Sequence, residues 1–286
     1  LAMFNISPMR TIVYAEEENL NIITTNNVKL YPELIGVPKS TVFKLYVNNQ
    51  EVNVYKAGKT LSFAQFEIAG NVEVRVSIPE GEEIKSYDLS PHSLNIASRK
   101  KNNTITFFID KPSNIIIQDV NGYTEILSIL AEYIEEDIPD LESEDVINIL
   151  DIQDAGNIPK VDSTGVNYSG DLIQEAIDNL NNGQTLYFPQ GKYIIGNISL
   201  KSNTSIYLAP EAMLKASNNK DHFFGAHSII TAGPTCKNAR IYGRGIIDGN
   251  GKVLRNPSTE SGQLSLIRSD TGSDSLLVEG IILNNS

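Results

Sequence analysis

Cysteine, tryptophan and long apolar runs are rare or missing in this chain. Its 286 residues include one cysteine, Cys236, and no tryptophan. A single cysteine excludes an intrachain disulfide framework and a cysteine-rich metal site, so we expect Cys236 to be a small buried hydrophobic residue. No apolar run approaches the roughly 18 residues that a membrane-spanning helix needs, and the sequence therefore predicts no membrane span.

Basic residues are missing from one long stretch. Residues 123–154 carry eleven carboxylates and no Lys or Arg, so they supply −11 of the net charge of −12. The carboxylates lack the alternating ligand order of a calcium loop, and we interpret residues 123–164 as an acidic, solvated linker. A short amphipathic helix at its start is an alternative. No basic stripe is visible elsewhere, which argues against nucleic-acid binding.

Short alternating runs fill the first part of the chain. The apolar content is 41% and the aromatic content only 7%, which fits β structure built from Ile, Val and Leu. Seven short runs separated by turn residues predict a β-sandwich over residues 1–122. The expected strands are Val42–Val47, Val52–Tyr55, Ala64–Ile68, Val72–Ile78, Ser93–Ile96, Thr104–Ile109 and Asn114–Gln118. Tyr46, Tyr55, Tyr87, Phe107 and Phe108 could stack on a sugar, but core packing is the favoured interpretation.

The period becomes helical after residue 168. Apolar residues at 172, 173, 176, 177 and 180 share one face, Asp171 and Gln174 are spaced as in a capping box, and Gly183 follows. A lone amphipathic helix before a β array can cover its open apolar end. We therefore predict a capping helix.

Residues 185–286 repeat a plan at an offset of about 35 residues. Asn238-Ala-Arg-Ile-Tyr-Gly-Arg-Gly-Ile-Ile and Asp274-Ser-Leu-Leu-Val-Glu-Gly-Ile-Ile each contain an alternating run, a glycine and an Ile-Ile pair. A weaker copy begins at Ser205. A fixed period of this length indicates stacked coils that bury their apolar side only against neighbouring coils.

Two polar excursions, Ser217–Lys237 and Gly249–Asp274, interrupt the repeat. Both leave after the Ile-Ile-type strand of their unit, so we expect them on one face, where a solenoid builds its binding groove. Asp221, His222, His227 and Arg240 are the candidate substrate-binding residues, with exposed loop positions as the alternative. Asp248, between Ile247 and Gly249, is expected to form a turn rather than to act as a catalyst.

The order of these motifs resembles a known family. Gly170-Asp-Leu-Ile-Gln-Glu-Ala-Ile-Asp, Leu186-Tyr-Phe-Pro-Gln-Gly-Lys-Tyr and Ile241-Tyr-Gly-Arg-Gly-Ile-Ile-Asp-Gly-Asn-Gly are similar to the opening coils of the pectin-lyase-like right-handed β-helix. The likeness is greatest to polygalacturonase-type glycoside hydrolases of family 28, and more distant to the dextranase-like family 49. It implies an all-β fold: a β-sandwich over residues 1–122, then the first coils of a right-handed parallel β-helix over residues 165–286.

The resemblance also implies a reaction. Members of family 28 hydrolyse glycosidic bonds with inversion, using aspartates spaced roughly 6.5 to 9.5 Å apart to admit a water molecule. Their Asn-Thr-Asp, Asp-Asp, Gly-His-Gly and Arg-Ile-Lys motifs do not occur here. No catalytic residue is therefore assigned, and we expect these residues beyond Ser286. The expected partner is a polysaccharide such as pectin or another plant or microbial glycan. We expect no cofactor, no metal and a monomeric intact protein that is secreted, periplasmic or on the cell surface.

Two alternatives stay open at this point. A polysaccharide lyase would need Ca²⁺-binding carboxylates and a base that removes the C5 proton. A non-catalytic β-helix adhesin or tailspike-like binder would need neither.

Because the sequence stops on the turn after a strand, without a polar cap, we interpret the chain as an N-terminal fragment. We expect it to be inactive by itself. Release of reducing sugar from polygalacturonate or dextran above background would contradict this expectation.

Overall fold

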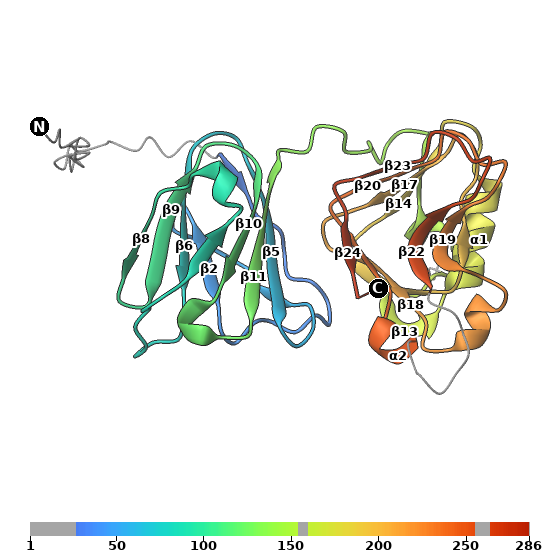
Figure 1. Cartoon of the computed structure of the whole chain (residues 1–286). Helices are drawn as coiled ribbons and strands as arrows, with labels where there is room; N and C mark the ends of the chain where they lie inside the picture. The colour runs from blue at the N-terminus through green and yellow to red at the C-terminus, as the bar shows by residue number, and fades with distance from the viewer. Residues whose placement is uncertain (1–26, 154–159, 255–263, 286) are drawn as a thin grey trace, which may run out of the picture.

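The computed structural model describes residues 27–153, 160–254 and 264–285, which form a β-sandwich followed by a parallel β-helix (Figure 1). Each unit has its own apolar core. This arrangement confirms the expected fold class.

The sandwich consists of two sheets. The sheet nearer the β-helix, called the inner sheet, has the order β1-β5-β11-β10-β7 with β4 on β5. Its strands are β1 Val28–Lys29, β4 Tyr55–Lys56, β5 Leu61–Ile68, β7 Asp88–Ser90, β10 Ser113–Gln118 and β11 Ile126–Tyr133. The outer sheet has the order β3-β2-β6-β9-β8. Its strands are β2 Lys44–Val47, β3 Gln50–Val52, β6 Val72–Ser77, β8 Ser98–Lys101 and β9 Thr104–Ile109.

The strands of the sandwich differ from the expected ones in several places. Strands β1 and β7 were not predicted, and the run expected over Val52–Tyr55 is divided between the ends of β3 and β4. The run expected as a strand over Ser93–Ile96 is a 3₁₀ turn, η1 His92–Leu94, closed by Asn95 with a positive φ of 49°. Strand β8 was not predicted because its Ser-Arg-Lys-Lys sequence has no apolar alternation and all four residues are exposed. Of the five candidate stacking aromatics, Tyr55 and Phe107 are buried, whereas Phe108 is 49% exposed.

The segment interpreted as a linker lies partly inside the sheets. Residues 126–133 form β11, which pairs parallel with β5 and antiparallel with β10, so the helical alternative for this stretch is wrong. Leu127, Ile129 and Ala131 alternate into the core. Further apolar residues on the other face, Ile126, Leu130 and Ile134, obscured this period of two in the sequence. β12 Val146–Asn148 and β13 Thr164–Tyr168 belong to the first coil. Of the expected linker, residues 134–145 connect the two units.

Three parallel sheets form the β-helix. The first sheet has the order β12-β14-β17-β20-β23, the second β13-β15-β18-β21-β24 and the third β16-β19-β22. Their further strands are β14 Thr185–Phe188, β15 Gly191–Ile195, β16 Ile198–Ser199, β17 Ser205–Leu208, β18 Ala212–Ala216, β19 Ser228–Ala232, β20 Arg240–Gly243, β21 Ile246–Asp248, β22 Ser265–Ser269, β23 Leu277–Glu279 and β24 Ile282–Asn284. The remaining helices are α1 Gly170–Asn179, α2 Gly251–Leu254, η2 Val120–Gly122, η3 Ile149–Asp151 and η4 Lys220–Phe223.

The register follows the sequence repeat. Ser205 pairs with Arg240 and Arg240 with Leu277, so the copies lie on successive coils. The Ile-Ile match is shifted by one residue, because Ile246 pairs with Ile282 rather than Ile281. Two residues, Arg244 and Gly245, separate Gly243 from Ile246, whereas only Ile281 separates Gly280 from Ile282, so this corner is one residue longer than in the next coil.

Both polar excursions leave the second sheet at the same corner, as predicted. Each also contains a strand of the third sheet, β19 in the first and β22 in the second. The true corner segments are therefore shorter than the sequence suggested, and part of the second, residues 255–263, lies outside the described residues.

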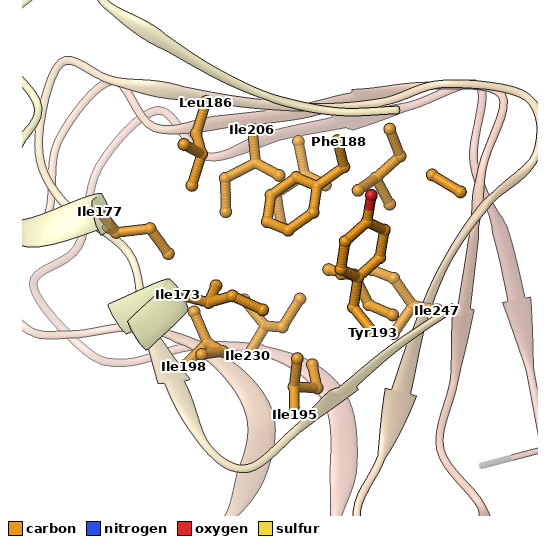
Figure 2. Packing of buried hydrophobic residues seen from close by; sticks show 14 of the residues in the cluster. Ile173, Ile177, Leu186, Phe188, Tyr193, Ile195, Ile198, Ile206, Ile230 and Ile247 are labelled. Atoms are coloured by element: carbon orange, nitrogen blue, oxygen red, sulfur yellow. The ribbon is translucent and has the colours of Figure 1, made fainter. Parts of the chain in front are cut away.

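Helix α1 closes the start of the β-helix. Figure 2 shows Ile173 and Ile177 projecting from α1 toward Leu186 and Ile198 in the core. The Gln174 side-chain amide donates to the Ser199 carbonyl at 3.0 Å and accepts from the Ser199 N–H at 2.7 Å. A side-chain amide thus replaces a neighbouring strand at the exposed edge of β16.

The expected capping box of α1 is wrong. Ser169 is the N-cap residue and makes no side-chain cap, because its hydroxyl accepts from Asp162 N–H instead. The helix ends at Asn179, before Gly183, and Lys201 Nζ donates to the free carbonyls of Asp178 and Leu180 at 2.7 and 2.5 Å.

A left-handed residue precedes each strand of the first sheet from β14 onward. Gly183, Asn203, Asn238 and Ser275 occupy this corner, with φ of 88°, 57°, 52° and 57°. Asn238 Nδ2 donates to Asn203 Oδ1 at 2.9 Å, which links two successive corners. Ser275 is the only one of the four that is neither Gly nor Asn, and serine is less suited to this conformation.

We therefore predict that Ser275→Asn stabilises the protein by about 0.5–1 kcal/mol, because asparagine tolerates the left-handed region better than serine. Urea unfolding followed by circular dichroism measures the change. Ser273→Asn, two residues earlier and without a positive φ, is the control. A loss of stability in Ser275→Asn alone would contradict the assignment of this corner.

Glu125 organises the base of the inner sheet. Its Oε1 accepts from Ser40 and Ser62 hydroxyls at 2.7 and 2.6 Å, and Lys56 Nζ donates to Oε2. Burial alone would raise the pKa of this carboxyl, but the hydrogen bonds from Lys56 and the two serines outweigh burial and lower it.

A carboxyl with a lowered pKa stabilises the folded state above the pKa of the unfolded chain, and this contribution is lost as pH falls through the folded-state pKa. We expect the free energy of unfolding to fall below about pH 4.5. Glu125→Gln is expected to cost about 1–3 kcal/mol at pH 7 and to flatten this pH dependence. Urea unfolding of the wild type and Glu125→Gln at several pH values tests this prediction, and Glu51→Gln, at an exposed position, is the control. The same dependence of unfolding free energy on pH in the wild type and Glu125→Gln would contradict the prediction.

Candidate functional site

An open cleft of about 780 Å³ lies where the sandwich meets the β-helix. We call it the interdomain cleft. It is lined by Ile68–Gly70, Asp110–Pro112, Glu132–Asp137, Arg240, Tyr242–Arg244, Glu279 and Gly280.

Three tyrosines on successive coils form a column that ends in the β-helix wall of this cleft. Tyr187, Tyr207 and Tyr242 are in register on the outward side of the first sheet. Their neighbouring ring centroids are 5.1 and 5.0 Å apart. The Arg240 guanidinium lies 3.6 Å from the Tyr242 ring centroid, which ends the column with a cation over an aromatic face.

Arg240 also binds two carboxylates. Its Nη1 contacts Asp137 Oδ2 at 2.5 Å, Nε donates to Glu279 Oε1 at 3.0 Å, and Nη2 contacts the same oxygen. Asp137 comes from the connecting segment and Glu279 from the next coil, so Arg240 joins both to β20. Burial lowers the pKa of Arg240, but these two carboxylates outweigh burial and raise it.

Arg244 reaches from the β-helix into the sandwich. Its Nε donates to Glu67 Oε1 at 3.0 Å, and its Nη2 donates to the Tyr133 carbonyl at 3.1 Å. The Glu67 side chain is fully buried and also has Lys29 Nζ at 3.2 Å. A buried carboxylate needs such partners, because burying an unpaired charge is costly.

Apolar contacts reinforce this junction. Leu34, Tyr55 and Phe63 of the sandwich form one buried cluster with Met213 and Ile246 of the second sheet. Tyr55 Oη accepts from the Leu34 N–H at 2.8 Å, which fixes the residues that lead into the contact. The two units are therefore held by both ion pairs and apolar packing.

The surroundings of the cleft raise the pKa of the Glu135 carboxyl. Burial raises its pKa, Arg244 and the Tyr207 hydroxyl lower it, and the Glu67 charge raises it again, with a raised pKa as the net result. The Tyr207 hydroxyl donates to Glu135 Oε2 at 3.1 Å. Glu135 therefore fixes the connecting segment to the tyrosine column.

Two of the predicted site residues lie at the corner after the second sheet. His222 on η4 stacks on Tyr168, with ring centroids 3.6 Å apart, and its Nδ1 lies 2.8 Å from Ser217 Oγ. The Tyr168 hydroxyl donates to Asp171 at 3.0 Å. Asp221 precedes His222 on η4, and Phe224 directly after the turn is 94% exposed. A flat ring stack next to an exposed aromatic suits contact with a sugar face.

The other two predicted residues lie apart from this stack. His227 precedes β19, where its carbonyl accepts from Ser265 N–H at 3.0 Å. Arg240 lies on the first sheet and lines the interdomain cleft. The structure thus places Asp221 and His222 on one turn, whereas Arg240 pairs with Asp137 and Glu279. A shared role of the four predicted residues in substrate binding stays a prediction.

Sequence reasoning missed the partners of these residues. Tyr168 and His222 are 54 positions apart in the chain, and no spacing rule connects them. Arg244 had a signal, because Arg244 and Gly245 separate Gly243 from the Ile-Ile pair, whereas Gly280 is followed directly by Ile281. Asp248 has the expected turn role, since its Oδ1 accepts from Asn250 N–H at 2.7 Å.

Within the described ranges, no group of three or more His, Cys, Asp or Glu side chains is arranged to hold a metal ion. Among the same residues, no helix has the length and apolar character needed to cross a membrane.

We predict that Arg244→Met lowers the free energy of unfolding by about 3 kcal/mol, because Glu67 stays buried with only Lys29 as a charged partner. Arg268→Met removes an exposed pair with Asp270 and should cost less than about 1 kcal/mol. Adding Glu67→Gln to Arg244→Met should recover part of the loss. Equal effects of Arg244→Met and Arg268→Met in urea unfolding would contradict a buried junction.

No protein-family model matches the chain, and no curated protein matches its sequence. Several solved structures are similar to it. A putative glycosyl hydrolase from Parabacteroides merdae is 28% identical, with a TM-score of 0.41, over 48% of this chain and 64% of that one. The family 28 exopolygalacturonase from Yersinia enterocolitica is 17% identical, with a TM-score of 0.41, over 76% and 53%.

Dex49A from Penicillium minioluteum is 16% identical, with a TM-score of 0.52, over 90% of this chain. The matched part is 55% of Dex49A, so the chain spans little more than half of that structure. Over that length the chain shares the fold of Dex49A, a pectin-lyase-like right-handed β-helix.

Proposed function

We propose that this chain is the N-terminal portion of a polysaccharide-degrading glycoside hydrolase. The observation that carries the proposal is the fold: a sandwich and a capped β-helix that match Dex49A over 90% of the chain. The matched part is 64% of the Parabacteroides merdae glycosyl hydrolase and 53% of the Yersinia enterocolitica exopolygalacturonase. The activity of the whole protein is therefore part of the proposal.

The geometry suits a polymeric substrate. Successive coils repeat the same corner, so the side chains at that corner form a line parallel to the stack. Asp221 and His222 occupy this corner on the third coil, and the Tyr168 ring, at the end of β13 on the first coil, stacks on His222. We assign them to hydrogen bonding and stacking with sugar residues, and we assign no catalytic carboxylate within the chain.

The proposed reaction is inverting hydrolysis. One carboxylic acid would protonate the leaving oxygen, and a second carboxylate would activate water on the opposite face of the sugar. We place these groups on coils after Ser286 and the intact protein outside the cytoplasm, as a monomer acting on pectin or another plant or microbial glycan.

Reading the encoding DNA past the codon for Ser286 is the first test. We expect an open frame with further coils that carry paired aspartates. The extended product should release reducing sugar from dextran or polygalacturonate, whereas the 286-residue chain should not. A frame that ends at Ser286, or an extended product inactive on both polymers, would favour a binding protein instead.

We also predict that His222→Ala weakens polysaccharide binding by the extended product about tenfold, because it removes the ring that stacks on Tyr168 and the contact with Ser217. The matched control is His92→Ala, since His92 is exposed and belongs to the sandwich. Affinity gel electrophoresis with dextran and polygalacturonate gives the dissociation constants. An unchanged constant for both polymers would remove His222 from the site.

A further inference from the structure

The outward side of the outer sheet is basic. Its inward residues, such as Leu45, Val76 and Ile105, are buried, and their neighbours along each strand point to solvent. The strand register arranges these outward residues in two rows across the sheet. One row is Tyr46, Arg75, Thr106 and Arg99, and the other is Lys44, Ser77, Thr104 and Lys101. We call these eight residues the basic face.

A shallow hollow of about 600 Å³ crosses β6, β9 and β8 on this face. Four basic side chains and one carboxylate line it, together with asparagine and threonine side chains. The lining residues are Glu73, Arg75, Arg99–Thr104 and Thr106. In a protein of net charge −12, this hollow is a local region of positive potential.

The basic face carries four cations, Lys44, Arg75, Arg99 and Lys101; Lys100, which also lines the hollow, instead donates to the Ile84 and Lys85 carbonyls. Arg75 is held in place by Glu73 at 3.4 Å, by Asn49 Oδ1 at 2.6 Å and over the Tyr46 ring at 5.5 Å. Arg99, Lys101 and Lys44 form no ion pair within the described parts of the chain. Arg75 is therefore pre-oriented, and the other three cations keep their charge unpaired.

The basic face is also accessible to a ligand from solvent. Figure 1 shows β8, β9 and β6 in the layer of the sandwich that lies away from the β-helix. The contacts between the two units come from the inner sheet instead, through Glu67 of β5 and the Tyr133 carbonyl of β11. Occupying the basic face would therefore leave the junction intact.

The spacing of the charges suits an extended polymer. Neighbouring strands lie about 4.8 Å apart, so the backbones that carry Arg75 and Arg99 are separated by about 10 Å, with Thr106 between them. Arg99 and Lys101 are about 7 Å apart along β8. The hydroxyls of Thr104 and Thr106 lie between the cations, and Ser77 Oγ is 2.9 Å from Thr104 Oγ1.

We propose that the basic face binds a carboxylated polysaccharide, with the arginines and lysines on its carboxylates and the threonine hydroxyls on its sugar hydroxyls. Charge complementarity favours an anionic chain, and the neutral hydroxyls between the cations favour one whose charged groups stand beside sugar hydroxyls. This site does not depend on the proposed hydrolysis, since it lies on a different unit from the β-helix.

The test uses the 286-residue protein and affinity gel electrophoresis with polygalacturonate, and with dextran as the neutral polymer. We expect polygalacturonate to retard the protein at about 0.15 M salt and dextran not to do so through this face. The double variant Arg99→Gln/Lys101→Gln should weaken polygalacturonate binding at least tenfold and reduce the salt dependence, because two carboxylate contacts are lost.

Two further variants separate recognition from bulk charge. Lys59→Gln/Lys237→Gln makes the same change in net charge away from the outer sheet, and its binding should stay within about twofold of wild type. Thr106→Val removes a hydroxyl without changing charge and should weaken binding several-fold. Circular dichroism checks that each variant is folded.

Three results would overturn the proposal: no retardation of the wild-type protein by polygalacturonate, equal losses in the two double variants, or displacement of polygalacturonate by an equal charge of single-stranded DNA. The last would indicate a nucleic-acid surface. Because no hydrolysis is measured, these outcomes are independent of the search for an active extended product.

Discussion

Backbone pairing between successive coils is the constraint on which the β-helix depends. Each strand can pair with the next coil only if the chain turns at the same place on every circuit, and left-handed residues before the first-sheet strands make that turn. The third sheet begins with β16 in the second coil, and α1 takes the place of an earlier strand beside it: Gln174 supplies one donor and one acceptor to Ser199. Corner and cap together give the stack its fixed register.

The sandwich depends on the same stack through one corner. Arg244 lies in the turn between β20 and β21, which is one residue longer than its counterpart in the next coil, and it reaches Glu67 from there. The tyrosine column and Glu135 then hold the connecting segment against the first sheet. The acidic residues of this segment therefore have two roles: Glu135 and Asp137 bind the β-helix, whereas others remain in solvent.

Local pattern predicted much of the fold, whereas long-range partners were not predictable. The repeat, the capping helix and most sandwich strands follow from apolar periodicity and turn residues within short windows. Strand β8 has no such period, and β19 was hidden inside a segment interpreted as polar. Glu67 and Arg244 are 177 positions apart, and the cations of the basic face meet only through the pairing of four strands. No sequence window contains such information, so the search for a basic stripe missed this face.

The buried Arg244–Glu67 pair has a consequence for avidity. A module on a flexible tether raises the effective concentration of a polymer near a second site over a wide range of distances. A module fixed by a buried ion pair and an apolar cluster permits only one separation and one orientation. A polysaccharide held on the outer sheet would reach the β-helix only by passing around the edge of the sandwich. Short oligosaccharides would then occupy the two surfaces independently, and only chains long enough to span them would gain from simultaneous engagement.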